Sequence, residues 1–332
     1  MKLRINSRIL GTALRVVTVL VIVALVYLGY TVWSSQQRVT QGTVASRAID
    51  NLVKEVEKNP NNPQARVLLA QALAAAGRVD QAVEQLNYAL EIDANSVGAL
   101  ETLGLIAMQR GEWATAEGYW RRIVEIVGKS PMASQDQRME RANHYLGLVL
   151  IERNEYEEAV LYLKEALRIR RDASDTHYAL AVAYRELGSV SNQRKELETA
   201  LAFDPLLPEA NYDMALLLLA DGDRAGAAEL LRRSVDNAKG RAEPAAELEK
   251  LGPFEDRLAA AERLSTSDAQ AALVEARIAI AIAPADLTAA RLVARLLEEL
   301  DKKDDAALAW ERVRTLAPND QEATDALKRL GQ

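Results

Sequence analysis

Residues 97–130, VGALETLGLIAMQRGEWATAEGYWRRIVEIVGKS, determine how the rest of the chain is interpreted. Leu100 and Ala107 belong to an apolar stripe at helical spacing, which predicts a first helix with one buried face. Gly111 then breaks the pattern, as expected where a helix ends in a left-handed conformation. A second stripe begins at Trp113, so the stretch predicts two short helices joined by a tight turn.

Small and large side chains alternate across these two helices. Gly104 and Ala116 would let the backbones approach closely, and Trp113 and Trp120 would fill the space on either side. This pattern resembles the tetratricopeptide repeat (TPR), a helix–turn–helix motif of about 34 residues. The resemblance implies an all-α fold, a TPR-like right-handed α-solenoid in which helical hairpins stack on their neighbours.

The same frame recurs along most of the chain. Full units of the motif begin at residues 63, 97, 140, 174, 208, 253 and 287. Ahead of them, Ala48 and Pro60 fit a lone second helix in residues 41–60. The sixth unit departs most from the motif, because Arg263 stands where Tyr is expected and Ser267 where Gly is expected. The resemblance therefore implies about seven repeats and a half-repeat.

The N-terminal segment predicts a transmembrane helix. Residues 1–15 are basic, and residues 16–33 (VVTVLVIVALVYLGYTVW) carry no charge. Such a helix would span roughly 27 Å, close to the roughly 30 Å hydrocarbon core of a bilayer. Aromatic residues gather at its far end, where they favour the headgroup level. The basic flank predicts a single-pass anchor with a cytoplasmic N-terminus and extracytoplasmic repeats.

Two other interpretations of residues 16–33 stay open. A cleaved signal peptide would have a shorter apolar core and a small-residue cleavage site, which the following SSQQRVTQG does not offer. A buried helix of a globular domain fits the basic flank poorly. The uncleaved anchor is the interpretation that the sequence favours.

The charge of the remaining chain is acidic. Five of the 41 basic residues lie in residues 1–38, which leaves 36 against 48 acidic residues and a formal charge of −12. Phosphate neutralisation needs clustered Lys and Arg, so the balance disfavours nucleic acid as a partner. The chain has no cysteine, which excludes disulfides and CxxC redox sites but does not fix the compartment.

Interruptions in the frame predict the domain boundaries. Residues 34–43 form a polar linker after the anchor, and residues 131–139 interrupt the frame, with Ser134 and Gln137 resembling a capping box. Residues 242–252 form a second insertion, either an extra helical turn or two or a joint. We expect these breaks to give a solenoid in residues 44–241, two further repeats in residues 253–320 and a capping helix in residues 321–332.

The sequence predicts no enzyme, cofactor or metal site. It contains no P-loop, GxSxG or HExxH motif. The two histidines, His144 and His177, fall in adjacent repeats, and Asp175 is the nearest candidate for a further metal ligand. Paired acidic residues such as Glu157 and Glu158 begin second helices, where carboxylates complement the helix dipole.

The resemblance points instead to a concave groove lined by the first helix of each repeat. Apolar residues recur on this face from the second unit to the fifth, and a contiguous exposed apolar strip usually marks a binding surface. Some of these side chains could instead pack between neighbouring helices. The predicted partner-binding residues are Glu101, Leu105, Met108, His144, Leu148, Ile151, Tyr178, Val182, Arg185, Tyr212, Leu216 and Leu219.

One specialisation of the family does not carry over. TPR domains that grip the C-terminal carboxylate of chaperones use Lys and Asn at set groove positions, and this chain has Val67, Gln71, Glu101 and Leu105 there. The sequence therefore predicts a non-enzymatic, membrane-anchored scaffold that binds a protein or peptide in its groove. Two alternatives stay open: an assembly chaperone for an envelope system, such as cytochrome c maturation, a pilus or secretion, and a structural subunit of a permanent membrane complex. The oligomeric state does not follow from the sequence.

Overall fold

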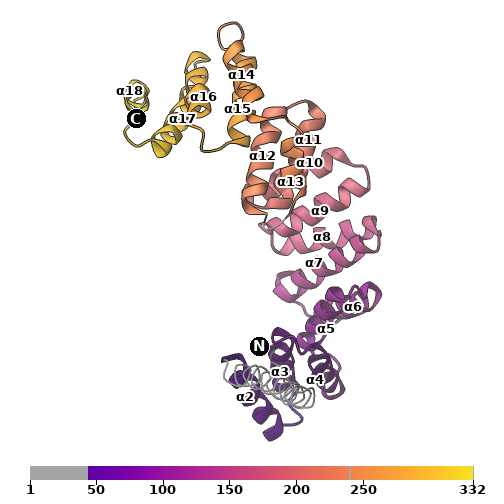
Figure 1. Cartoon of the computed structure of the whole chain (residues 1–332). Helices are drawn as coiled ribbons and strands as arrows, with labels where there is room; N and C mark the ends of the chain where they lie inside the picture. The colour runs from indigo at the N-terminus through magenta and orange to yellow at the C-terminus, as the bar shows by residue number, and fades with distance from the viewer. Residues whose placement is uncertain (1–43, 239–240, 332) are drawn as a thin grey trace, which may run out of the picture. The chain divides into compact units, whose positions relative to one another are not determined.

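The structure is a computed structural model that describes residues 44–238 and 241–331. Within those ranges it contains seventeen α-helices, one short 3-10 helix and no strand (Figure 1). The predicted basic segment (1–15), anchor (16–33) and linker (34–43) lie outside the described residues. None of the helices that are described combines the length and the apolar character needed to cross a bilayer.

The helices divide between two compact units, residues 1–126 and 127–332. The first unit holds α2 (Val44–Lys58), α3 (Pro63–Ala75), α4 (Val79–Ile92), α5 (Val97–Gln109) and most of α6 (Trp113–Gly128). The second holds η1 (Ala133–Gln135), α7 (Gln137–Glu152), α8 (Tyr156–Ile169), α9 (Ser174–Glu186), α10 (Val190–Phe203), α11 (Pro208–Asp221), α12 (Arg224–Asn237), α13 (Glu243–Glu249), α14 (Phe254–Leu264), α15 (Ala269–Ile282), α16 (Leu287–Glu299), α17 (Lys303–Leu316) and α18 (Gln321–Arg329).

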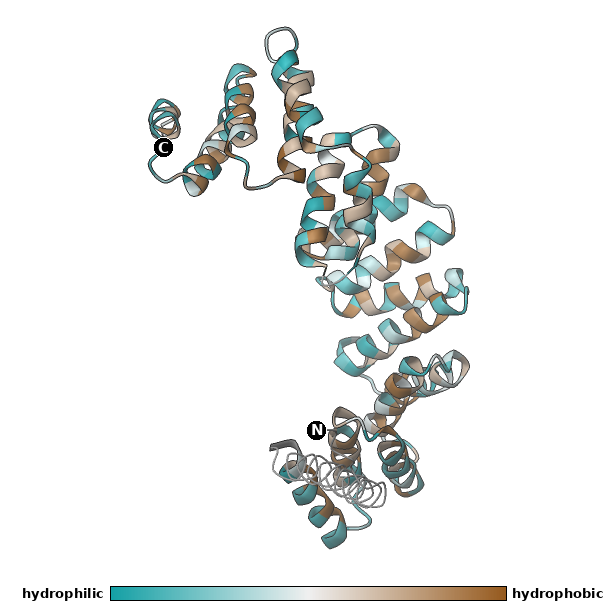
Figure 2. Ribbon diagram, in the orientation of Figure 1, coloured by the Kyte–Doolittle hydropathy of each residue, from teal (hydrophilic) through white to brown (hydrophobic). Residues whose placement is uncertain are grey.

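Within each unit, consecutive helices pack as hairpins and each hairpin contacts the next. In the second unit α7 packs on α8, α8 on α9, α9 on α10 and α10 on α11. Figure 2 shows that these helices carry both hydrophobic and hydrophilic residues. One face of each helix is therefore available for the core between neighbouring hairpins, as expected of an all-α repeat solenoid. The predicted all-α repeat solenoid is confirmed for the residues described.

The core is built from the same motif positions in nearly every repeat, and the fourth repeat differs in having the buried Gln193 in place of the small residue. Small residues of the second helices are completely buried, namely Ala82, Ala116, Ala159, Ala227, Ala272 and Ala306. One turn later a large residue is buried in most repeats, namely Leu86, Trp120, Leu163, Leu197, Leu231 and Trp310. The alternation lets helix backbones approach at the small residue while the large one fills the adjacent space.

Two glycines mark the closest approach of paired helices. A Cβ added to Gly104 of α5 would lie 2.8 Å from the Trp120 ring of α6, and one added to Gly147 of α7 would lie 2.5 Å from Leu163 Cγ of α8. Both distances are too short for a real contact. The predicted role of Gly104 in bringing two helices together is therefore confirmed, and Gly147 plays the same role in the next repeat.

The turn inside each hairpin uses one left-handed residue. Four repeats have glycine there: Gly77, Gly111, Gly188 and Gly222, with φ between 68° and 87°. Asn154 and Asp301 adopt the same conformation in the third and seventh repeats, with φ of 61° and 57°. These two residue types tolerate left-handed backbone best after glycine. The turn geometry is thus kept where the motif residue is lost.

The sixth repeat is the exception to this geometry. Its turn contains no left-handed residue, and its first helix, α14, is shifted by one residue relative to the motif. Ala261 is completely buried where the motif predicts Ala260, and Leu264 packs on the core in place of the exposed Arg263. Ser267 instead belongs to a longer turn that ends at the N-cap Asp268.

Two smaller expectations are also corrected. The half-repeat is a real helix, α2, but Ile49 is its buried residue and Ala48 is exposed. The helix after the first insertion is not capped by Ser134. Asp136 occupies the N-cap, where its carboxylate accepts a hydrogen bond of 2.8 Å from the Arg138 amide. An Asp at this position satisfies an otherwise unpaired backbone N–H.

The second insertion and the C-terminal segment both form helices. The seven-residue α13 packs on α12, and α12 also packs directly on α15. Leu248 and Leu251 enter a shared core with Ile278 of α15. At the C-terminal end of the second unit, α18 packs on α17 and buries Leu327 against it.

Candidate functional site

The twelve predicted groove residues all lie on first helices of the repeats. Three are on α5 of the first unit, and the other nine are on α7, α9 and α11 of the second unit. Leu105, Arg185 and Leu216 are exposed, His144 is buried, and the remaining eight are half-buried. Partial exposure on one helix face is what a binding surface requires, but it does not identify an occupant. The assignment of these residues to a partner stays a prediction.

In the first unit, the predicted groove face of α5 has apolar side chains next to a pair of hydrogen-bonded polar side chains. Leu105 is 43% exposed, while Met108 one turn away is half-buried. Gln71 of α3 donates a hydrogen bond of 3.3 Å to the Thr102 hydroxyl of α5. Thr102 in turn donates to the Gly98 carbonyl. A polar link therefore joins the first helices of two successive repeats.

In the second unit a similar link joins α7 to α9 through His144. Its Nδ1 lies 2.8 Å from the Thr176 hydroxyl, and its Nε2 lies 3.9 Å from the Asp175 carboxylate. Burial lowers the pKa of His144 below its ordinary value, and the charge of Asp175 opposes this only in part. The imidazole is therefore held largely neutral near pH 7, with Thr176 fixing the orientation of the ring.

His144 also lines a polar cavity of about 430 Å³. The Glu140 carboxylate lies there 3.0 Å from the Arg170 guanidinium, with Glu140 almost fully buried. Burial raises the pKa of Glu140, while the positive charge of Arg170 acts in the opposite direction. Charged groups of both signs thus surround the cavity, and Asp175 completes its edge.

The network around Asp213 was missed from the sequence. Arg185 of α9 donates to the buried Asp213 carboxylate of α11 at 2.8 Å. Burial raises the pKa of Asp213, whereas Arg185 and a hydrogen bond from Tyr178 lower it. Two of the predicted groove residues, Tyr178 and Arg185, therefore converge on one carboxylate. A carboxylate on the buried side of an otherwise apolar helix was the available signal in the sequence.

An apolar strip lies on the same first helices as these two polar clusters. Leu148 and Ile151 of α7 and Val182 of α9 are all half-buried. They are spaced along successive first helices, with the His144 cluster and the Asp213 cluster contributed by the same helices. The candidate site thus combines apolar contacts with polar groups of fixed orientation.

The second insertion lies against the predicted groove of the fifth repeat. Arg241 forms an ion pair of 3.4 Å with Glu209 of α11. Tyr212 and Leu219 of α11 pack on the core cluster that contains Leu248 of α13. The pKa of Tyr212 is raised by burial and by the nearby Glu247 carboxylate of α13. Part of the face predicted to bind a partner is therefore covered by the chain itself.

The second histidine lies on the other side of α9. His177 Nδ1 is 2.7 Å from Glu196 of α10, and its Nε2 is 3.0 Å from the Arg171 carbonyl. Burial alone would lower its pKa, but Glu196 and the Arg171 carbonyl together raise it. Each histidine thus has its own partners, and the residues that the structure describes contain no group of three or more metal-ligand side chains.

Comparison with known proteins places these features in a family context. A sequence profile described as "Tetratricopeptide repeat" matches residues 43–100, and one described as "TPR repeat" matches residues 147–188. Cellulose synthase 1 operon protein C of Komagataeibacter xylinus is 27% identical over 164 residues, 48% of this chain and 12% of that protein. The BBSome complex member BBS4 of Bos taurus is 23% identical over 206 residues, 54% of this chain and 40% of that protein. The chain therefore spans well under half the length of these relatives.

Solved structures resemble the chain at the level of helical repeats. YrrB, described as a TPR protein with an unusual peptide-binding site, is 17% identical to this chain and has a TM-score of 0.48. The similar region covers 61% of this chain and 100% of YrrB. PilF of Pseudomonas aeruginosa is 18% identical over 80% of this chain and 97% of its own, with a TM-score of 0.47. The two profile matches identify tetratricopeptide repeats in residues 43–100 and 147–188, and stacked helical hairpins continue through the other described residues of the chain.

Proposed function

We propose that this protein is a non-enzymatic TPR scaffold that binds a partner protein or peptide on the first-helix face of its third and fourth repeats. The observation that carries the proposal is the half-buried apolar strip of Leu148, Ile151 and Val182 on the helices that also carry the two polar clusters. Apolar side chains of this kind supply affinity when a partner covers them. The exposed Arg185 guanidinium beside Asp213 supplies selectivity, because a partner that removes water from it without offering a polar group loses binding energy.

The proposed binding surface does not extend fully onto the fifth repeat, because the chain itself covers part of that face. Tyr212 and Leu219 of α11 already pack on the core cluster that contains Leu248 of α13. The open part of the face therefore lies on α7 and α9. We expect substitutions at Leu148 and Val182 to weaken binding more than substitutions at Leu219.

The proposal includes attachment to a membrane through residues 16–33, with the N-terminus in the cytoplasm and the repeats outside it. The charge-free run of eighteen residues after a basic segment supports this topology. An anchor of this kind would confine the partner to the membrane surface and raise its effective concentration. The names of the relatives fit a role in assemblies, since one is a complex member and one belongs to a cellulose synthase operon.

The topology can be tested directly because the chain has no cysteine. Single cysteines introduced at Ser7 and at the exposed Asn51 would lie on opposite sides of the membrane. In intact cells a membrane-impermeant maleimide is expected to label the second and not the first. Labelling of both, or of neither until the cells are lysed, would contradict the proposed topology.

The binding surface is tested by affinity capture of the full-length protein in mild detergent. Leu148→Asp combined with Tyr178→Ala is expected to abolish capture of the partner while helicity by circular dichroism is unchanged. Leu161→Asp is the matched control, because Leu161 is 65% exposed on the second helix of the same hairpin. Unchanged capture by the groove variant would refute the assignment. Partners rich in CxxCH or pilin-like segments would identify an assembly chaperone, and a stable oligomer would favour a structural subunit.

A further inference from the structure

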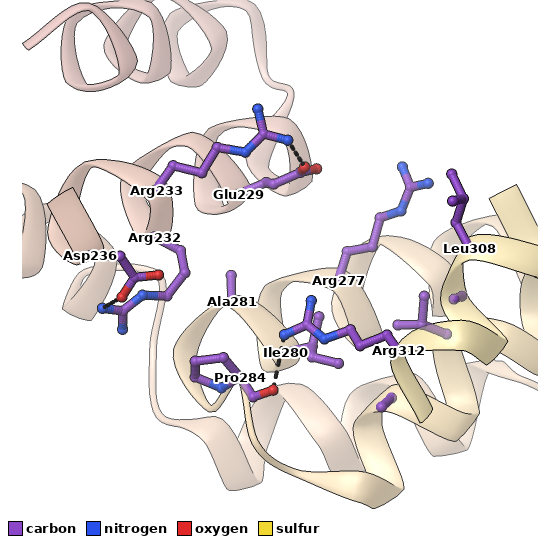
Figure 3. Close-up of a pocket in the computed structure, with 13 residues that line it drawn as sticks. Glu229, Arg232, Arg233, Asp236, Arg277, Ile280, Ala281, Pro284, Leu308 and Arg312 are labelled. Carbon is purple, nitrogen blue, oxygen red and sulfur yellow. Dashed lines mark hydrogen bonds and ion pairs between the residues drawn. The ribbon is translucent and has the colours of Figure 1, made fainter. Parts of the chain in front are cut away.

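A second cavity lies in the second unit, away from the proposed groove. It measures about 430 Å³ and is lined mainly by α12, α15 and α17, the second helices of the last three repeats. None of the twelve predicted groove residues contributes to it. Figure 3 shows side chains from α12 and α15 approaching the cavity from opposite sides, with α17 closing it beyond. A cavity of this size is in the range that binds a small ligand or the side chains of a peptide.

The cavity is basic in an otherwise acidic chain. Four arginines line it, Arg232, Arg233, Arg277 and Arg312, against the two carboxylates of Glu229 and Asp236. Two positive charges are therefore in excess, whereas residues 39–332 as a whole carry a formal charge of −12. Like charges gathered in one cavity repel each other, so an anionic occupant would be stabilised there.

Two of these arginines are satisfied by the carboxylates beside them on the same helix. Arg233 pairs with Glu229 at 2.6 Å and Arg232 with Asp236 at 2.5 Å. Even so, the buried Nε of Arg232 has no hydrogen-bond acceptor in the part of the chain that is described. A buried donor without an acceptor is costly unless a ligand or solvent satisfies it.

The other two arginines have no carboxylate partner among the described residues. Arg312 donates to the Pro284 carbonyl at 2.9 Å and has no carboxylate partner among the described residues. Arg277 forms neither a hydrogen bond nor an ion pair with any residue that the structure describes. Figure 3 shows both side chains extending between α15 and α17. An unpaired guanidinium presents a planar set of donors that matches a carboxylate in a bidentate arrangement.

The floor of the cavity is apolar. Ile280, Ala281 and Val293 line it and are all more than 90% buried. Leu308 stands at its edge and is 71% exposed. A ligand that fills the cavity would therefore need an apolar group as well as negative charge. An inorganic anion supplies the negative charge but no apolar group.

The surroundings limit how far a negatively charged ligand can extend. Beyond Leu308 the surface carries Asp304 and Glu311 of α17. A long polyanion such as nucleic acid, or an anionic bilayer surface, would meet these carboxylates on leaving the cavity. A short acidic peptide segment avoids this repulsion, because its few carboxylates can all lie against the arginines of the cavity.

We infer that this cavity binds a short acidic peptide segment of a partner protein, in which Asp or Glu flanks a Leu- or Phe-sized side chain. The apolar side chain occupies the space between Ile280 and Leu308, and the flanking carboxylates bind Arg277 and Arg312. The site lies on second helices, so it is separate from the proposed groove and can be occupied at the same time.

The test uses an array of immobilised nonapeptides in which Asp or Glu flanks Leu or Phe, probed with the full-length protein. The strongest binders are then measured in solution by fluorescence anisotropy. We expect binding that falls with added salt and is lost when the acidic residues of the peptide are replaced by Asn and Gln. If no acidic peptide binds, or if the Asn and Gln versions bind equally well, the inference is wrong.

Two variants identify the site of binding. Arg277→Gln and Leu308→Ser are each expected to weaken the peptide about tenfold or more, because each removes a contact to the ligand. Neither change breaks an ion pair or hydrogen bond within the described chain, so the fold is expected to persist. Arg263→Gln, an exposed arginine on α14, is the matched control.

Competition distinguishes the peptide from other anions. Inorganic phosphate, single-stranded oligonucleotides and phosphatidylglycerol vesicles are added to the preformed complex at equal ionic strength. Little displacement is expected from each of them. If phosphate binds as well as the peptide and depends equally on Arg277, the site is a simple anion site. If vesicles or oligonucleotides bind more tightly through Arg277, the acidic-peptide assignment is wrong.

Discussion

Replacement of Gly147 by alanine tests the packing that holds the repeats together. Gly147 faces Leu163 across the third hairpin, and a Cβ there would lie 2.5 Å from Leu163 Cγ and 2.6 Å from Cδ2. Leu163 is completely buried. The added methyl group must therefore displace α7 from α8 or force Leu163 into an unfavourable rotamer.

Two effects of opposite sign determine the size of the change. Alanine is favoured over glycine inside a helix by about 1 kcal/mol. Overpacking a well-filled core typically costs about 1–3 kcal/mol. Gly118 of α6 is the matched control, because a Cβ there would meet nothing within 4 Å. We therefore expect Gly118→Ala to raise the opening free energy of its hairpin by about 1 kcal/mol. The change caused by Gly147→Ala in its own hairpin should be less favourable than this by about 1–3 kcal/mol.

The measurement should be local, since a repeat array need not unfold in one step. Native-state hydrogen exchange reports the opening free energy of the amides of each hairpin. Leu163→Ala provides a further control, because the smaller side chain leaves room for the new methyl group. The cost of Gly147→Ala should largely disappear in that background. If Gly147→Ala stabilises its hairpin as much as Gly118→Ala does, the proposed close packing is wrong.

Three further predictions concern protonation, backbone conformation and the end of the array. Because the pKa of His144 is lowered by folding, the unfolded chain binds more protons near pH 6.5 and stability falls on acidification, so His144→Gln should reduce that loss. The pKa of His177 is raised by folding, so its protonated form stabilises the folded chain and His177→Gln should destabilise it mainly below about pH 6.5. Urea titrations between about pH 5 and pH 8 measure both effects. Asp301→Ala should cost about 1–2 kcal/mol in the same assay because φ is positive there, whereas Asp301→Gly should cost less. Removal of residues 321–332 should expose the core face of α17 and increase both dye binding and self-association in gel filtration; an unchanged elution profile and unchanged dye fluorescence would contradict this.

The regular part of the fold could be predicted because each repeat solves the same packing problem. A small residue opposite a large one, as at Gly104 and Trp120, has few alternatives when two helices must approach closely. The left-handed turn is likewise a requirement of the backbone, so its position was visible wherever glycine stood there. Asn154 and Asp301 meet the same requirement without glycine, which the motif alone did not indicate.

The irregular part could not be predicted, because it depends on contacts between segments. The shift in α14 replaces Ala260 by Ala261 in the core, and nothing within an alanine-rich helix separates these two choices. The position of α13 beside Tyr212 depends on how α12 meets α15, which involves residues far apart in the sequence. The pairing of Arg185 with Asp213 is also set between repeats.

The candidate site shows the same division. The sequence identified the helix face, since periodicity defines which residues share a side. It did not separate exposed from buried positions on that face. His144 and Leu216 occupy equivalent stripes, yet one is 8% exposed and the other 37%. The cavity lined by Arg277 and Arg312 was not found from the sequence, because its arginines come from three helices.

The central claim, that a partner binds on the first-helix face of α7 and α9, is tested most directly by site-specific photo-cross-linking in living cells. A photoreactive amino acid is placed at Leu148 or Val182 on the proposed face, and at Leu161 or Val190 on second helices. All four variants are compared at equal expression. We predict a discrete cross-linked partner from the first pair and none from the second. Cross-links to that partner only from Leu161 or Val190 would contradict the claim and move the interface to the opposite side of the repeats.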